Sequence, residues 1–95
     1  MKLKISIVGG PRTGDSFEMF AGDTLVFGRG QQSDTRIDDP TISRVHCEIA
    51  HHGKTIAIAD RGSSSGTFVN GSKIETATVE PGTQIQIGDT VLKIS

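Results

Sequence analysis

Glycine and proline interrupt this chain so often that no long helix can form in it. The sequence has 95 residues with twelve glycines and three prolines, and the longest stretch without either runs from Thr41 to His52. Apolar residues in that stretch are scattered among charged and hydroxyl residues, without a run of strong helix formers. Such a chain folds from short strands and turns, and its length fits one compact domain over residues 1–95.

Short segments of alternating apolar and polar residues predict these strands. Leu3, Ile5 and Ile7 alternate with lysine and serine, so one side of this segment faces a core and the other faces water. Asn70-Gly71 separates two further segments and predicts a tight hairpin. The remaining predicted strands cover residues 16–20, 24–27, 46–49, 56–60, 67–69, 73–74, 84–87 and 91–95. Many short strands at regular spacing predict an all-β sandwich of two sheets.

Charge and composition exclude several classes of function. The formal net charge is −1, so the chain has no basic excess for binding along a nucleic acid. No apolar run is long enough to span a membrane, so we expect no direct membrane insertion by this domain. The single cysteine, Cys47, excludes an internal disulfide and a cysteine-rich zinc site. We therefore expect a cytoplasmic location, either free or as the cytosolic domain of a larger membrane-associated protein.

Two loops, over residues 28–44 and 60–67, are longer than a sandwich requires, and loops of this kind carry function. Arg29 lies between two glycines, so its guanidinium has little steric cover and can offer a planar fork to a phosphate. Taken alone, one such arginine is more often a solvated surface residue. Ser43 and Arg44 offer a hydroxyl and a second positive charge, although alone they also fit an ordinary polar loop.

The loop from Ser63 to Thr67 gathers small hydroxyl donors between glycines, and such a loop can turn hydroxyls and main-chain N–H groups toward an anion. The alternative is a flexible serine-rich turn. The loop lies too far from Gly28 to form a P-loop, and no Gly-Lys-Ser/Thr ending is present. Nucleotide binding is therefore disfavoured, and we expect no cofactor.

His46 has two interpretations. It is a general base beside Ser43 in a small hydrolase, or it is a structural histidine that ties one loop to a neighbouring backbone or hydroxyl group. We favour the structural role and expect no catalytic residue, because the chain lacks the Gly-x-Ser-x-Gly elbow and an obvious orienting acid. Asp38, Asp39 and Asp60 are candidates for that acid by proximity in sequence only.

Metal binding and cysteine chemistry are also disfavoured. His51 and His52 are adjacent, so on a strand they point to opposite faces and cannot easily chelate one ion. We expect no metal site there, and a hairpin turn at Gly53-Lys54 instead. Cys47 alternates inward and is predicted to be a small core residue rather than a nucleophile.

The order of these motifs closely resembles the forkhead-associated (FHA) domain family, in its bacterial type. The chain has Gly28-Arg29, then Ser43 to His46, then Ser63 to Gly71, then Gly88-Asp89 before a last strand. The resemblance spans almost the whole chain. It implies a sandwich of two twisted, mostly antiparallel sheets with about eleven short strands, and a ligand site on loops at one end. It also implies that residues 1–95 are a single FHA domain cut from a longer protein.

The resemblance assigns roles residue by residue. Phosphate contacts are implied for Arg29, Ser43, Arg44 and Ser64. A contact with the peptide main chain is implied at Ser65, where the family commonly has asparagine, and serine offers one donor in place of an amide's paired groups. The residues implied to support the site are Gly28, His46, Gly66, Thr67, Asn70 and Gly71.

The function implied by the resemblance is phosphothreonine-dependent recognition of a protein or peptide. The partner would be a phosphothreonine-containing protein, and no nucleic acid is expected. An alternative is a phosphate-independent assembly module with the same fold, as in membrane-anchored rings of bacterial secretion systems such as type III. Asp38 and Asp39 near the pocket loop predict that acidic flanks are disfavoured. The oligomeric state stays open.

Overall fold

The computed structural model describes residues 2–31 and 35–95. Over these two ranges the chain forms eleven strands and no helix. No segment of this described part is therefore a helix long and apolar enough to cross a membrane. The strands are β1 (Lys2–Gly9), β2 (Ser16–Phe20), β3 (Thr24–Gly28), β4 (Thr35–Arg36), β5 (Cys47–His52), β6 (Thr55–Asp60), β7 (Thr67–Val69), β8 (Ser72–Ile74), β9 (Thr76–Val79), β10 (Gln84–Ile87) and β11 (Thr90–Ile94).

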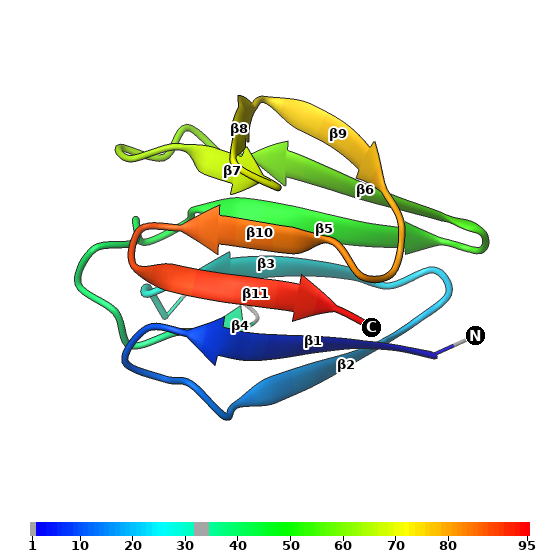
Figure 1. Cartoon of the computed structure of the whole chain (residues 1–95), viewed down its shortest axis with the longest axis horizontal. Coiled ribbons are helices and arrows are strands. Elements are labelled where there is room, and N and C mark those ends of the chain that lie inside the picture. Colours follow the sequence, from blue (N-terminus) through cyan, green and yellow to red (C-terminus); the bar gives the residue numbers. More distant parts are fainter. Residues whose placement is uncertain (1, 32–34) are drawn as a thin grey trace.

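The strands form two sheets packed face to face. The six-stranded sheet has the order β2-β1-β11-β10-β7-β8, and the five-stranded sheet has the order β4-β3-β5-β6-β9. Figure 1 shows the six-stranded sheet in front of the five-stranded sheet. Apart from the parallel pair β3–β4, the described pairings in both sheets are antiparallel. The predicted all-β, mostly antiparallel sandwich is confirmed.

The apolar positions of the alternating segments form the core between the sheets. β1 shows the pattern clearly, because Leu3, Ile5 and Ile7 are buried while Lys2 and Lys4 are exposed. The other buried apolar side chains are Met19, Phe27, Ile37, Ile42, Cys47, Ile49, Ile56, Ile58, Ile85, Ile87, Leu92 and Ile94. Phe17 meets Phe27 edge to face across the two sheets, with ring centroids 5.7 Å apart. The core therefore joins both sheets into one scaffold for the loops.

Two strands were missing from those predicted by alternation. β4 has two residues and runs parallel to β3, so it is too short for any periodic pattern. β9 lies at the edge of the five-stranded sheet, and its threonines at 76 and 78 are exposed. An edge strand with half-buried small residues carries little apolar signal.

Both predicted hairpin turns are present. Val69 pairs with Ser72 around Asn70-Gly71, and both turn residues have positive φ, 48° and 88°. This backbone twist is the one that a two-residue hairpin requires. The second turn, at Gly53-Lys54, closes the hairpin between β5 and β6.

The loops that carry the predicted site gather at one end of the sandwich. Figure 1 shows the loops that follow β1, β4 and β6, and the β10–β11 turn, at this end. The two termini lie at the opposite end. The fold thus separates the chain's ends from the loops of interest by the length of the sheets.

Candidate functional site

A pocket of about 400 Å³ lies at the loop end of the sandwich, and we call it the end pocket. All four predicted phosphate-binding residues line it, from three separate segments of the chain. Its lining residues are Arg29, Pro40, Thr41, Ile42, Ser43, Arg44, Val45, Gly62 and Ser64. The arrangement combines two guanidinium groups and two serines with an apolar wall.

Main-chain and side-chain hydrogen bonds hold Arg29 in place directly after the buried residue Gly28. Its N–H donates to the carbonyl of Ser43 (3.1 Å), and the next N–H, of Gly30, donates to the carbonyl of Arg44 (3.0 Å). The Arg29 Nε–H donates to the carbonyl of Ile42 (2.8 Å). This bond fixes the guanidinium plane and leaves the two terminal nitrogens as donors for a ligand.

Ser43 and Ser64 join the two pocket loops. The main-chain N–H of Ser64 donates to Ser43 Oγ (3.0 Å), although 21 positions separate these residues. Because the Ser43 oxygen acts as the acceptor here, its hydroxyl proton remains to be donated to an anion. The bond therefore places both serines at the same wall of the end pocket.

His46 lies behind this wall and is fully buried. Its Nδ1 accepts the main-chain N–H of Ser43 (3.1 Å), and its Nε2 lies 2.8 Å from the carbonyl of Gly66. Since Nδ1 accepts and a carbonyl cannot donate, these bonds assign the proton to Nε2. Both ring nitrogens are thus occupied by the backbone of the two loops, as expected for a support.

Asp60 organises the loop that carries Ser64, a role that the sequence analysis missed. One carboxylate oxygen accepts the N–H groups of Gly62 (3.1 Å) and Ser63 (3.2 Å). The other oxygen accepts the hydroxyls of Ser63 and Thr67, the latter at 2.8 Å. Burial by itself raises the pKa of Asp60, but the hydrogen bonds from Ser63 and Thr67 outweigh it, so the pKa lies below its ordinary value.

Asp39 performs a similar task for the other pocket loop and was also missed as a support. It is buried, and its carboxylate accepts the Thr41 N–H (2.9 Å), the Thr41 hydroxyl (2.7 Å) and the Thr90 hydroxyl (2.6 Å). Burial raises the pKa of Asp39, but the bonds from Thr90 and Thr41 outweigh it and the pKa is lowered. Because Asp39 faces inward, the predicted aversion to acidic flanks now depends on Asp38 alone, which is exposed.

The β10–β11 turn supports the same loop from the side. The Asp89 N–H donates to the Thr41 hydroxyl oxygen (2.7 Å). A Cβ atom added to Gly88 would lie 2.4 Å from that oxygen, and Gly88 has a φ of +59°. Glycine at 88 is therefore needed for both the close approach and the backbone conformation.

The remaining predicted supports are at or near the Ser63–Thr67 loop. Thr67 is buried on Asp60, and Gly66 is buried at a φ of +89°. Ser65 is exposed beside the end pocket and does not line it. The Asn70 side chain accepts the N–H of Gln84 (3.2 Å), so Asn70, in its turn with Gly71, braces β10 and acts on the loop only through β7.

The other titratable candidates lie inside the sandwich. Cys47 is fully buried, and burial raises the pKa of its thiol to about 12. His51 is buried too, and its Nε2 lies 2.8 Å from the Gly53 carbonyl, in the hairpin that was predicted there. Both positions favour packing roles over chemistry.

Comparison with known proteins agrees with this geometry. The FHA domain family matches residues 25–88 of the chain. An oxoglutarate dehydrogenase inhibitor of Corynebacterium jeikeium is 37% identical over 79 residues, which cover 83% of this chain and 54% of that protein. The chain spans about half the length of the curated relatives it matches.

Solved structures give the same result. An FHA domain from Chlamydia trachomatis superposes with a TM-score of 0.94 at 26% identity, over 99% of this chain and 96% of that one. A domain studied for phosphothreonine-dependent FHA interactions superposes with a TM-score of 0.88 at 26% identity, over 99% and 95% of the two chains. Fold and end pocket together define a β-sandwich domain that carries a pocket of cationic and hydroxyl side chains on loops at one end.

The chain belongs to the FHA domain family. The family model covers residues 25–88, which include the three segments that line the end pocket. The family membership predicted from the order of the motifs is thereby confirmed.

Proposed function

We propose that the end pocket binds the phosphate of a phosphothreonine through Arg29, Ser43, Arg44 and Ser64. A single observation carries this assignment: donors from three chain segments line one pocket, where bonds to Ile42, His46 and Ser43 hold Arg29, Ser43 and Ser64 in turn. A phosphothreonine brings about −1.5 to −2 charge and three acceptor oxygens. The pocket therefore meets a dense anion with prealigned donors.

The apolar wall of the end pocket accounts for a preference for threonine. Exposed Pro40 and half-buried Val45 lie beside the donors. The extra methyl group of phosphothreonine can contact such a wall, and burial of one methyl contributes about 0.8 kcal/mol. We expect a phosphoserine peptide to bind about fourfold more weakly on this account alone.

The proposed module catalyses nothing. A hydrolase that used Ser43 and His46 would need an imidazole nitrogen at the serine hydroxyl. Here Nδ1 accepts the Ser43 main-chain N–H and Nε2 faces the Gly66 carbonyl. His46 therefore has no lone pair directed at the hydroxyl, which supports a structural role.

We also propose a domain organisation, a class of partner and a cellular location for this chain. Residues 1–95 act as one domain, and the partner is a phosphothreonine-containing protein. Cys47 is a free thiol, which fits the reducing cytoplasm, either for a free protein or for the cytosolic part of a membrane-associated one.

The test is fluorescence anisotropy with a phosphothreonine peptide and its unphosphorylated twin. Arg29→Ala removes at least two charge-assisted hydrogen bonds, so we expect a loss of about 100-fold or more in affinity for the phosphopeptide. Arg12→Ala is the matched control, because Arg12 is an exposed arginine of the β1–β2 loop that pairs with Asp15 (3.1 Å). The phosphopeptide affinity of Arg12→Ala should stay within about twofold of that of the unmutated domain.

Circular dichroism must show that Arg29→Ala remains folded. Equal affinity of the unmutated domain for both peptides would refute phosphate recognition. A stable partner complex that survives Arg29→Ala would instead support the phosphate-independent assembly function.

A further inference from the structure

A second hollow, of about 150 Å³, lies on the outer face of the six-stranded sheet, and we call it the side hollow. The strands β7, β10 and β11 and the β7–β8 turn form it. Its lining residues are Phe68, Asn70, Gly71, Gln84, Gln86 and Val91. Gln86 pairs across the sheet with Phe68 on one side and with Val91 on the other, so these three side chains form one row over three strands.

This row places apolar side chains next to one another on a solvent-facing surface. Phe68 and Val91 lie on the outside of the sheet, where neighbouring side chains cover them in part and leave them half-buried. Val8, beside Gly9 in the next strand, continues the row and is 45% exposed. Single exposed apolar residues need no explanation, but adjacent ones rimmed by polar groups mark interaction sites.

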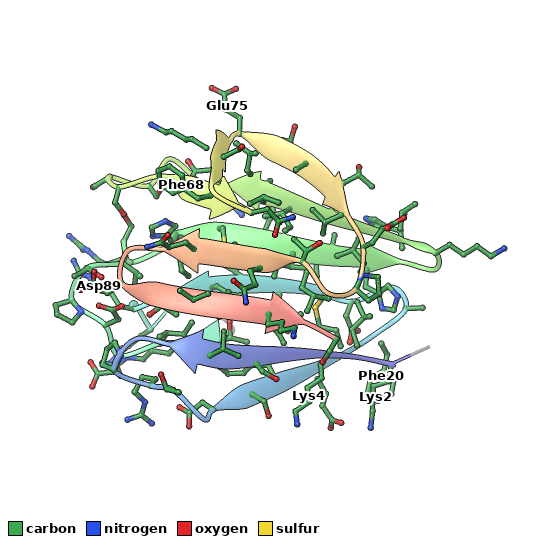
Figure 2. The ribbon with its side chains drawn as sticks, viewed as in Figure 1. Lys2, Lys4, Phe20, Phe68, Glu75 and Asp89 are labelled. Atoms are coloured by element: carbon green, nitrogen blue, oxygen red, sulfur yellow. The ribbon has the colours of Figure 1, made fainter. Side chains whose placement is uncertain are left out.

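The side hollow is close to the end pocket along the chain. Ser64 lines the end pocket and Phe68 lines the side hollow. Four peptide units join them, so their Cα atoms are at most about 14 Å apart. Figure 2 shows Phe68 near the loop end of the sandwich. An extended segment of about four or five residues covers this distance.

The path between the two sites is kept narrow by Gly66. A Cβ atom added there would lie 2.9 Å from Lys73 Cε and 3.4 Å from Phe68 Cε1. The loop therefore packs directly on two side chains at the edge of the side hollow. Exposed Ser65 lies on this path, between the two sites.

The charges around the side hollow indicate what it binds. Lys73 pairs across the sheet with Phe68, and Lys93 pairs with Gln84. Lys2 and Lys4 lie farther along the same face, where Glu18 makes an ion pair with Lys2 (2.8 Å). The cations next to the side hollow are therefore Lys73 and Lys93, and neither makes an ion pair with an acidic residue of the described part of the chain. The surroundings favour an apolar side chain with acidic neighbours.

We propose that the side hollow binds the phosphorylated partner itself, through an apolar side chain flanked by acidic residues, about four or five positions from the phosphothreonine. The inference rests on the proposed function of the end pocket. The side hollow would also give the domain a second contact with the peptide, which would add to the single donor that Ser65 provides. Phosphate capture and side-chain docking would then act on one segment.

The probes are three synthetic phosphothreonine peptides. A short probe carries alanines beside the phosphothreonine. Two long probes add, on the N-terminal or the C-terminal side, a leucine about five positions away between two aspartates. We expect one long probe to bind about tenfold more tightly than the short probe, because its leucine side chain moves from water into the side hollow.

Two variants of Gln86 test where the added affinity arises. Gln86 is exposed on β10, and its amide donates to the Gly88 carbonyl (3.2 Å), so each variant must first be shown to bind the short probe with unchanged affinity. Gln86→Glu should remove most of the tenfold gain by repelling the aspartates, and Gln86→Lys should keep or increase it. Thr78→Glu is the matched control, because it adds the same charge at an exposed position of β9. Backbone amide shifts of Phe68 and Val91 should move with the long probe and not with the short one.

The outcomes separate the two proposals. If the short probe binds no better than its unphosphorylated form, the proposed function fails, and this inference fails with it. If the short probe binds but neither extension adds affinity, or Gln86→Glu and Thr78→Glu behave alike, the side hollow is not a partner site. A concentration-dependent dimer that Gln86→Glu abolishes would assign the hollow to a second copy of the chain and overturn the proposal.

Discussion

Substitution of Asp60 tests whether the pocket loop depends on one carboxylate. In Asp60→Ala, the buried hydroxyl of Thr67 loses its acceptor, and so does the half-buried hydroxyl of Ser63. The Gly62 N–H lies at an exposed residue, so water can replace its bond. Counting only the buried groups, we expect a loss of about 2–4 kcal/mol in the free energy of unfolding. For a domain of this size this lowers Tm by about 10–25 °C.

Asp60→Asn is the informative companion variant. The asparagine oxygen can keep the two N–H bonds, while its amide group donates to the hydroxyls of Ser63 and Thr67, which can accept. The hydroxyl protons of Ser63 and Thr67 lose their acceptor together with the charge assistance, so we expect a loss of about 1–2 kcal/mol, less than in Asp60→Ala. Phosphopeptide affinity should fall more in Asp60→Ala than in Asp60→Asn, because Asp60 holds Ser63 and the proposed phosphate ligand Ser64 directly follows it. Urea unfolding gives the stabilities, and anisotropy gives the affinities.

The pH dependence separates the carboxylate from simple packing. The pKa of Asp60 is lower in the folded chain than in the unfolded one. Its contribution is therefore complete above the unfolded pKa, about 3.9, and is lost as pH falls through the folded pKa. The stability gap between the unmutated domain and Asp60→Asn should thus shrink over the acid range that begins at about pH 4 and extends downward through the folded pKa. Asp39 titrates in both proteins and cancels in this difference. A gap that stays constant over that range would refute the argument.

Three further predictions follow from single positions. Gly88→Ala should cost at least about 2 kcal/mol and weaken phosphopeptide binding, because its Cβ would collide with Thr41; Gly82→Ala, at a φ of +98° with open space around it, is the control in urea unfolding and anisotropy. Cys47 should react with a thiol reagent only in denaturant, because its pKa is about 12 and it is fully buried; fast labelling of the native domain would contradict this. Ser65→Asn should bind the phosphopeptide about three- to tenfold more tightly, since an amide adds a donor and an acceptor for the peptide main chain; an unchanged Kd in anisotropy would show that Ser65 lies off the peptide path.

Most of the sandwich could be predicted because its strands obey a strict alternation. The segments around Ile5, Ile85 and Leu92 each place their apolar residues on the buried face. β4 and β9 escaped because one has two residues and the other lies at a sheet edge. In both strands the pairing partner, and not the local sequence, decides the conformation.

The candidate site could be predicted in its ligand-facing residues but not in its supports. Arg29, Ser43 and Ser64 could be assigned because the order of their motifs resembles that of the FHA family, whereas each residue taken alone also fits a polar surface loop. Asp39 and Asp60 gave no such signal, since their partners are hydroxyls and N–H groups that only the fold brings close. An aspartate followed by Gly-Ser within a few residues, as at Asp60, is the pattern of a side chain that caps its own loop, and it was the available clue.

Charged and polar residues of the end pocket differ in burial, because an unpaired charge must stay in water whereas a paired polar group can be buried. Arg29, the proposed phosphate ligand, is exposed and can stay hydrated without a ligand, while its Nε–H holds the side chain on the Ile42 carbonyl. The groups that hold the loops can be buried, because each has its partner inside the protein: Asp39 on Thr41 and Thr90, and His46 between the two loops. In the proposed complex, binding would require little reordering of the loops, because the donors for the phosphate are already in place. Substitutions at the buried supports should consequently lower stability and affinity together, whereas Arg29→Ala should lower affinity while the domain stays folded.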